Sequence, residues 1–232
     1  MDLQHVIREI VKIPPTPQVL PKLQRLLRQP DSDPSDIVKV LKVDVSITAQ
    51  VLKFANSSYF GLAAPVQGLD EAVYIMGFRE IFKIVSVAAA KDVLAGALAF
   101  YNTREGEVLE NSIAAAQIMT AVSEANGMGG LESYYTTGLL HAIGMIVINQ
   151  YFHNRGLSAF GGHEGLEGPL EEASLEEERK LFGFDHAEAG AALLENWKFS
   201  EEISIPIRYQ YSPESSPSYR TITNCLKFSR ET

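Results

Sequence analysis

Histidine is the residue type in this chain best suited to bind a metal ion or to move a proton near neutral pH. His141 stands in the apolar segment Gly138–Gly144, and His186 follows Phe184-Asp185 at the predicted start of a helix. Both imidazoles could point into one pocket between helices. A lone histidine on an apolar helix face is more often a hydrogen-bonded core residue, so this second interpretation stays open beside the first.

A third histidine lies in a segment similar to the zinc-binding HExxH pattern, His163-Glu164-Gly165-Leu166-Glu167. Glu167 replaces the second histidine, and Gly165 and Gly168 break the helix that would bring two ligands to one face. The chain contains no GxGxxG, GxxxxGK[ST] or GxSxG motif for binding phosphate or presenting a nucleophile. Its one cysteine, Cys225, excludes an internal disulfide and a cysteine-rich metal centre. We therefore expect no metal at His163 and no cofactor.

The composition excludes several classes of protein. Of the 232 residues, 46% are hydrophobic, which is too many for a chain that is disordered over most of its length. The 20 Lys and Arg against 29 Asp and Glu give a net charge of −9, so we expect no nucleic-acid partner. The most apolar stretch, residues 84–100, is interrupted by Lys91 and Asp92, and no secretion signal is evident. We expect a cytoplasmic protein with no membrane partner.

The spacing of the apolar residues predicts helices along the whole chain. No run alternates between apolar and polar residues for long enough to suggest a strand, so we expect an all-α fold. Asp33 before Pro34 predicts an N-cap followed by the first helical residue. Further helices are expected at 46–58, 69–76 (closed by Gly77), 78–98, 107–126, 132–152, 185–197, 201–211 and 219–230. The polar turn at 102–106 is expected to divide the domain into two helical lobes, 1–103 and 104–232.

Two segments outside the core of these helices could contact a partner. The turn after residue 58 carries Tyr59, Phe60 and Leu62, which could form a surface for a protein partner or be buried between the lobes. Residues 156–169 hold five glycines and are expected to form a long mobile loop. The acidic residues near that loop, within 164–178, could face a basic partner or form a solvated helix face: Glu164, Glu167, Glu171, Glu172, Glu176, Glu177 and Glu178.

Several blocks of the sequence stand in an order typical of one family. In the N-terminal half these blocks are Ile13–Val19, Val43–Gly61 and Ala72–Gly77, and in the C-terminal half they are Gly138–Gly144 and Phe184–Ala191. Together they resemble the HDOD domain, the HD-related output domain of bacterial signalling proteins, over residues of about 13–213. The resemblance implies an all-helical signalling domain of bacterial origin.

The HD superfamily is named for a His-Asp pair that, with other histidines and an aspartate, binds a divalent metal and activates water against phosphate esters. Of the positions of this chain that match those ligands, His141 keeps the histidine of the pair, and Ala142 replaces its aspartate. Asn111 replaces an upstream histidine, and Gln210 and Tyr211, after Arg208-Tyr209, replace two further histidines. Replacing a carboxylate removes both a ligand and the negative charge that offsets the metal. The resemblance therefore implies a degenerate HD pocket, with no metal and no phosphohydrolase activity.

Our leading hypothesis is a non-catalytic regulatory module that binds a protein partner in a signalling pathway, or a small effector or nucleotide. The alternative is a residual metal-dependent phosphohydrolase or a nucleotide-binding pocket, formed by Asn111, His141, His186, Arg208 and Tyr211. In that alternative the Arg208 guanidinium would bind a phosphate. It could equally pair with one of the many glutamates.

Overall fold

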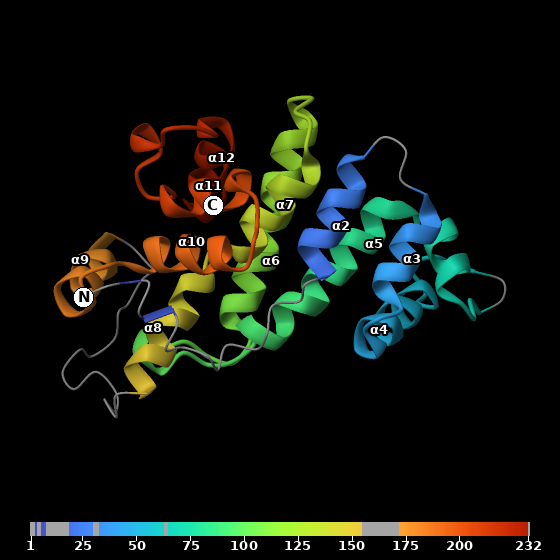
Figure 1. The fold of residues 1–232 in the computed structure, drawn as a ribbon, viewed down its shortest axis with the longest axis horizontal. Coiled ribbons are helices and arrows are strands. Elements are labelled where there is room, and N and C mark those ends of the chain that lie inside the picture. The colour runs from blue at the N-terminus through green and yellow to red at the C-terminus, as the bar shows by residue number, and fades with distance from the viewer. Residues whose placement is uncertain are drawn as a thin grey trace. The chain divides into compact units, whose positions relative to one another are not determined.

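The structure is a computed structural model, and it describes residues 3, 6–7, 19–29, 33–62, 65–154 and 172–231. The His163 segment and the glycine-rich residues 156–169 lie outside the described residues. The described part consists of helices and turns without a β-strand, which confirms the all-α prediction (Figure 1). None of the helices described has the length and apolarity needed to cross a bilayer.

The chain divides into two compact units. One unit is Pro17–Lys91, and the other combines Met1–Thr16 with Asp92–Thr232. The first contains α2 (Val19–Arg28), α3 (Pro34–Leu41), α4 (Val45–Ala55) and most of α5 (Leu69–Leu94). The second contains η1 (Ala99–Tyr101), α6 (Glu107–Ala125), α7 (Leu131–Leu140), α8 (Ile143–Asn154), α9 (Glu172–Phe182), α10 (His186–Asn196), α11 (Glu201–Arg208), η2 (Pro213–Ser215) and α12 (Arg220–Glu231).

Local signals set the helix ends in the Pro17–Lys91 unit. The Asp33 carboxylate accepts a hydrogen bond of 2.7 Å from the Ser35 N–H, and Pro34 takes the first helical position, as predicted. Asp44 caps α4 in the same way. Gly77 interrupts α5 with a φ of 75°, a left-handed value that favours glycine, so the predicted helix over 69–76 does end there.

Close helix contacts in the second unit depend on two glycines. A Cβ added to Gly138 of α7 would lie 2.6 Å from the Cα of Ala116 in α6. A Cβ added to Gly144 of α8 would lie 1.7 Å from the carbonyl oxygen of His186 in α10. Only a residue without a side chain permits these two approaches, and the second one sets α8 directly against the first turn of α10.

The prediction of one helix over 132–152 is wrong, because α7 ends at Leu140 and α8 begins at Ile143. His141 therefore lies at a break between two helices and not in the middle of one. Its Nδ1–H donates to the Gly138 carbonyl at 2.7 Å, and the Gln210 amide nitrogen donates to the His141 carbonyl at 3.2 Å. Side chains thus satisfy carbonyl groups at the point where the helix stops.

Candidate functional site

His186 is the centre of a buried polar network in the second unit. Its place in the first turn of α10 is set by a capping box, in which Asp185 accepts from the Glu188 N–H and Glu188 accepts from the Asp185 N–H. The His186 Nδ1 lies 2.9 Å from both carboxylate oxygens of Glu178, and its Nε2 lies 2.7 Å from the Tyr211 hydroxyl. Both ring nitrogens therefore have protein partners.

Glu178 of α9 is fully buried, and three donors surround its carboxylate. Besides the His186 ring, the Tyr101 hydroxyl donates at 2.7 Å and the His186 backbone N–H donates at 2.6 Å. Burial, reinforced by the negative charge of Glu178, raises the pKa of Tyr101 well above its usual value, so this hydroxyl keeps its proton. A buried carboxylate is tolerated only with such donors.

The expectation of an acidic surface is therefore wrong for Glu178. Leu175 and Phe182 are buried on the same face of α9, and Glu178 lies between them at helical spacing. Glu176 is exposed, and its carboxylate lies 3.8 Å from the Lys180 ammonium group, as expected for a solvated helix face. Glu164, Glu167 and Glu171 lie outside the described residues.

Tyr211 joins this network to the last helix. The guanidinium carbon of Arg230 lies 3.9 Å from the centre of the Tyr211 ring, and an Arg230 nitrogen donates to the Gln210 carbonyl at 3.5 Å. Burial raises the pKa of Tyr211, although the nearby charge of Arg230 opposes the shift. The Tyr211 hydroxyl is therefore protonated at neutral pH and can donate to a neutral His186 or accept from a charged one.

His141 is partly buried and uncharged at neutral pH. The pKa of its ring is lowered from 6.5 to about 4, chiefly by burial; the hydrogen bond to Gly138 opposes this shift, and Arg230 and His186 add to it. Because Nδ1 carries the proton that Gly138 accepts, Nε2 keeps a lone pair. The Oε1 of the fully buried Gln210 has no hydrogen-bond partner among the residues described.

The structure thus connects four of the proposed pocket residues, His141, His186, Gln210 and Tyr211, through hydrogen bonds and the Arg230 side chain. Asn111 is exposed on α6, and Ala142 is buried between α7 and α8. Arg208 forms an ion pair of 2.9 Å with Glu195. Pairing with a glutamate is the second of the two roles that the sequence analysis gave to Arg208.

These side chains do not fit a divalent metal of the kind that an HD site holds. Such a metal needs imidazole lone pairs and carboxylate oxygens, yet both His186 nitrogens and both Glu178 oxygens are engaged within the protein. Across the described ranges, no three His, Cys, Asp or Glu side chains are grouped as a metal site would require.

Sequence reasoning missed Tyr101, Glu178 and Arg230 as members of the network. The spacing of Leu175, Glu178 and Phe182 was the one signal available, since it places the carboxylate on the apolar face of its helix. Tyr101 and Arg230 lie far along the chain from His186, and no local pattern connects them to it.

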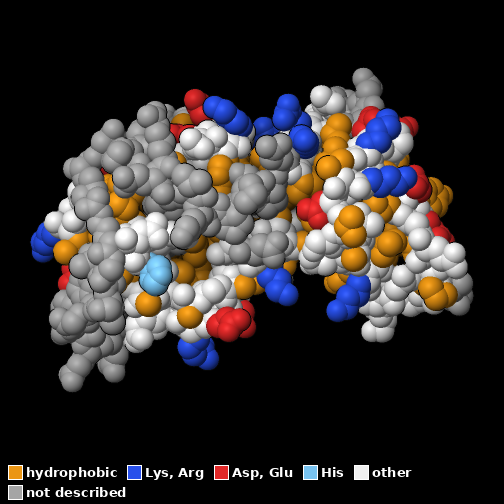
Figure 2. All heavy atoms as spheres, turned by 60° about the horizontal axis from the view of Figure 1, so that its bottom comes forward, with side chains coloured by type: hydrophobic (Ala, Val, Ile, Leu, Met, Phe, Trp, Pro, Cys, Tyr) orange, Lys and Arg blue, Asp and Glu red, His pale blue; other side chains and the backbone are white. Residues whose placement is uncertain are grey.

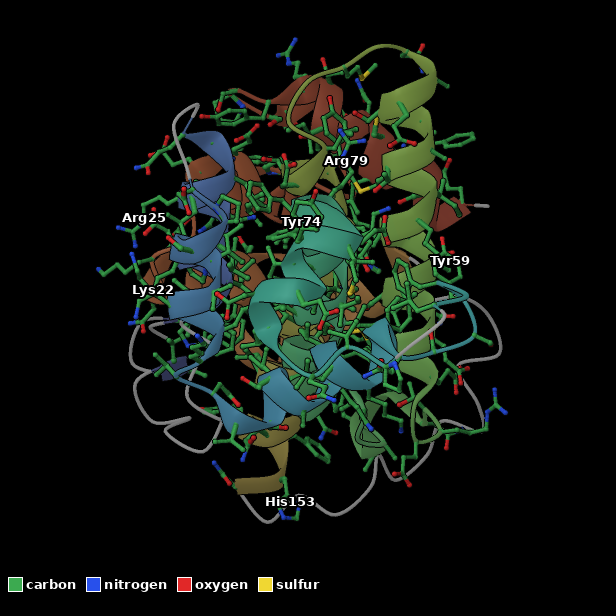
Figure 3. All side chains as sticks on the ribbon, turned by 90° about the vertical axis from the view of Figure 1, so that its right-hand side faces the viewer. Lys22, Arg25, Tyr59, Tyr74, Arg79 and His153 are labelled. Carbon is green, nitrogen blue, oxygen red and sulfur yellow. The ribbon has the colours of Figure 1, made fainter. Side chains whose placement is uncertain are left out.

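The proposed partner surface lies in the other unit. The Tyr59 side chain is 73% exposed, whereas Phe60 and Leu62 are partly buried. Figure 3 labels Tyr59 on the turn that follows α4, along with Tyr74 of α5. Ala63 and Ala64 lie outside the described residues.

Comparison with curated proteins finds a relative of similar sequence. The chain is 24% identical over 224 residues to an uncharacterized protein of Treponema pallidum, covering 95% of this chain and 42% of the relative. The chain therefore spans less than half the length of that curated relative.

Solved structures share its fold. An HDOD domain protein with unknown function from Geobacter sulfurreducens has a TM-score of 0.72 and 24% identity, covering 98% of this chain and 76% of that one. A provisionally assigned signal transduction protein from Marinobacter aquaeolei VT8 has a TM-score of 0.73 and 22% identity, covering 96% of this chain and 49% of that one. The model of the HDOD domain matches residues 13–213, and the chain therefore belongs to the HDOD domain family.

Proposed function

We propose that the protein is a non-catalytic regulatory module of a signalling pathway, which acts by binding a protein partner or a small effector. The observation that carries this proposal is the occupation of both ring nitrogens of His186, at 2.9 Å by Glu178 and at 2.7 Å by Tyr211. An imidazole that serves a catalytic metal must offer it a lone pair. His186 could do so only by giving up a buried hydrogen bond.

Charge supports the same proposal. The position that matches the aspartate of the His-Asp pair is Ala142, which supplies neither a ligand nor a negative charge. The positive charge of Arg230 lies close enough to the His141 ring to lower its pKa further. A divalent cation beside His141 would meet this positive charge at short range, where repulsion is strong.

The regulatory part of the proposal draws on the family and on its relatives. The protein from Marinobacter aquaeolei is provisionally assigned to signal transduction, and its fold is shared by this chain. A domain whose HD-like scaffold holds no metal can still present surfaces whose arrangement changes on binding.

A small effector remains a second candidate ligand because of two hydrogen-bond acceptors at the helix break. The His141 Nε2 keeps a lone pair, and the Gln210 Oε1 lacks a partner among the described residues. A ligand with N–H or O–H donors could satisfy both, whereas a metal would find only one imidazole there.

The test is metal analysis combined with a phosphodiesterase assay. The purified protein is incubated with Mn²⁺, Fe²⁺ or Mg²⁺, freed of loosely bound ions and analysed by plasma mass spectrometry, and hydrolysis of bis(p-nitrophenyl) phosphate is measured in parallel. We expect far less than one ion per chain and no hydrolysis above background. One or more tightly bound ions per chain, lost in His186→Ala and kept in His153→Ala, together with hydrolysis, would overturn the proposal. His153 is an exposed histidine of α8 and serves as the matched control.

A further inference from the structure

The surroundings of Glu178 differ from those of most acidic residues. The Asp and Glu side chains visible in Figure 2 stand at the molecular surface, where water solvates them. Glu178 is fully buried, and the protein solvates its carboxylate instead. The Tyr101 hydroxyl lies at 2.7 Å, the His186 backbone N–H at 2.6 Å and the His186 Nδ1 at 2.9 Å. Three donors that converge on two oxygens have the form of an oxyanion-binding site.

The three donors belong to elements other than α9, which carries Glu178. Tyr101 is part of η1, and both His186 donors are in the first turn of α10, which the capping box of Asp185 and Glu188 fixes. The Tyr101 and His186 rings also meet edge to face, with their centres 6.3 Å apart. Only the carboxylate comes from α9. The donors are thus supported as in a preformed ligand site, which loses little conformational entropy on binding.

The electrostatic setting favours a negative ligand at this point. The His186 N–H is one of the free amides in the first turn of α10, an 11-residue helix, and the partial positive charge of that helix end attracts an anion. Asp185 lies at the same helix end, but the Arg179 guanidinium pairs with its carboxylate and compensates the negative charge. A carboxylate among the donors therefore meets O–H and N–H groups that are directed at it.

The geometry selects a carboxylate among the oxyanions. The His186 Nδ1 lies 2.9 Å from both oxygens of Glu178, while the Tyr101 hydroxyl binds one oxygen and the His186 N–H binds the other. A planar group with two oxygens satisfies all three donors, whereas phosphate would bury two further oxygens without a donor in this set. The helix break at His141 and Gln210 is different, because it offers acceptors.

We infer that the donors of Tyr101 and His186 form a carboxylate-binding site, and that α9 occupies this site as an internal ligand through Glu178. A carboxylate supplied from outside competes with Glu178 for the same donors, so its binding is coupled to the docking of α9. This names an effector class for the unit, a molecule that bears a carboxylate. The effector class rests on the proposed regulatory function, whereas the site itself does not.

The test is chemical rescue of Glu178→Ala. This substitution removes one CH₂ group and the carboxylate, and acetate supplies the same atoms from solution. If acetate binds with a dissociation constant of about 10 mM, about 0.1 M acetate raises the folding equilibrium constant of the variant about tenfold over sodium chloride of equal ionic strength. Acetamide has the same shape but no charge, and it turns an NH₂ group toward the donors, so we expect little effect from it.

Urea denaturation at neutral pH, followed by circular dichroism, measures the rescue. If Glu178→Ala is unfolded in chloride, the same spectra show whether acetate restores its helices. The wild type, whose site Glu178 fills, and Glu176→Ala, which loses an exposed carboxylate of the same helix, should not distinguish acetate from chloride. Adding Tyr101→Phe to Glu178→Ala should weaken the rescue several-fold, whereas adding Tyr134→Phe, a change to a buried tyrosine of α7, should not.

Two results would overturn the inference. One is the lack of any effect of acetate on Glu178→Ala beyond that of chloride. The other is an equal effect of acetate on Glu176→Ala or on the wild type, or an equal effect of acetamide on Glu178→Ala. Because the assay contains no divalent metal, its outcome is independent of the metal analysis that tests the proposed function.

Discussion

Removing the Glu178 carboxylate should strongly destabilise the second unit. In Glu178→Leu the Tyr101 hydroxyl, the His186 N–H and the His186 Nδ1–H all lose their acceptor inside the protein. Each unsatisfied buried donor costs about 1–3 kcal/mol, and three donors lose their acceptor, so we expect the free energy of unfolding to fall by about 4 kcal/mol. Glu178→Gln keeps one acceptor oxygen but turns an NH₂ group toward donors, which should cost about 1–3 kcal/mol.

The measurement is urea denaturation followed by the fluorescence of Trp197, the one tryptophan, which caps the C-terminus of α10 and therefore reports on this unit. Glu176→Gln is the matched control, because Glu176 lies in the same helix but is exposed, and its removal should leave the unfolding midpoint unchanged. Equal midpoints for Glu178→Gln and Glu176→Gln would refute the argument that the buried network holds α9 in place.

Three further predictions follow from the structure. Folding lowers the pKa of His141 from 6.5 to about 4, so the unfolded chain binds more protons than the folded chain between these pH values. The free energy of unfolding should therefore decline as the pH falls through that window. The urea midpoints at pH 7 and pH 5 should differ less in His141→Asn than in the wild type. Gly144→Ala forces a methyl group against the α10 backbone and should cost about 3 kcal/mol or more in thermal or urea unfolding, whereas Gly129→Ala, with open space around it, should be nearly neutral. Asn56→Ala removes both hydrogen bonds to Val66, and hydrogen exchange of the 57–62 amides and of the Val66 amide should become faster while that of α12 does not change.

Local chemistry allowed much of the fold to be predicted from the sequence. A cap such as Asp33 before Pro34, or a stop such as Gly77, depends on residues within a few positions, and the structure confirms both. The break after Leu140 could not be predicted, because the side chain that binds the His141 carbonyl comes from Gln210, 69 residues further along. Hydrophobic spacing alone favours a continuous helix there.

The candidate site shows the same limit. The sequence identified His186, but the two partners that define its chemistry, Glu178 and Tyr211, lie on other elements. Glu178 stands in a run of glutamates, and composition assigned the whole run to the surface. The spacing of Glu178 from Leu175 and Phe182 places it on the apolar face of α9, and the packing of that face buries it while Glu176 stays exposed.

The network of Tyr101, Glu178, His186 and Tyr211 also constrains how this chain can change over evolution. Each member satisfies a buried group of another, so a neutral substitution at one position leaves a donor or acceptor unpaired at the next. We expect these four positions to vary together among close homologues, with an apolar residue at 178 accompanied by Phe at 101 and loss of the imidazole at 186.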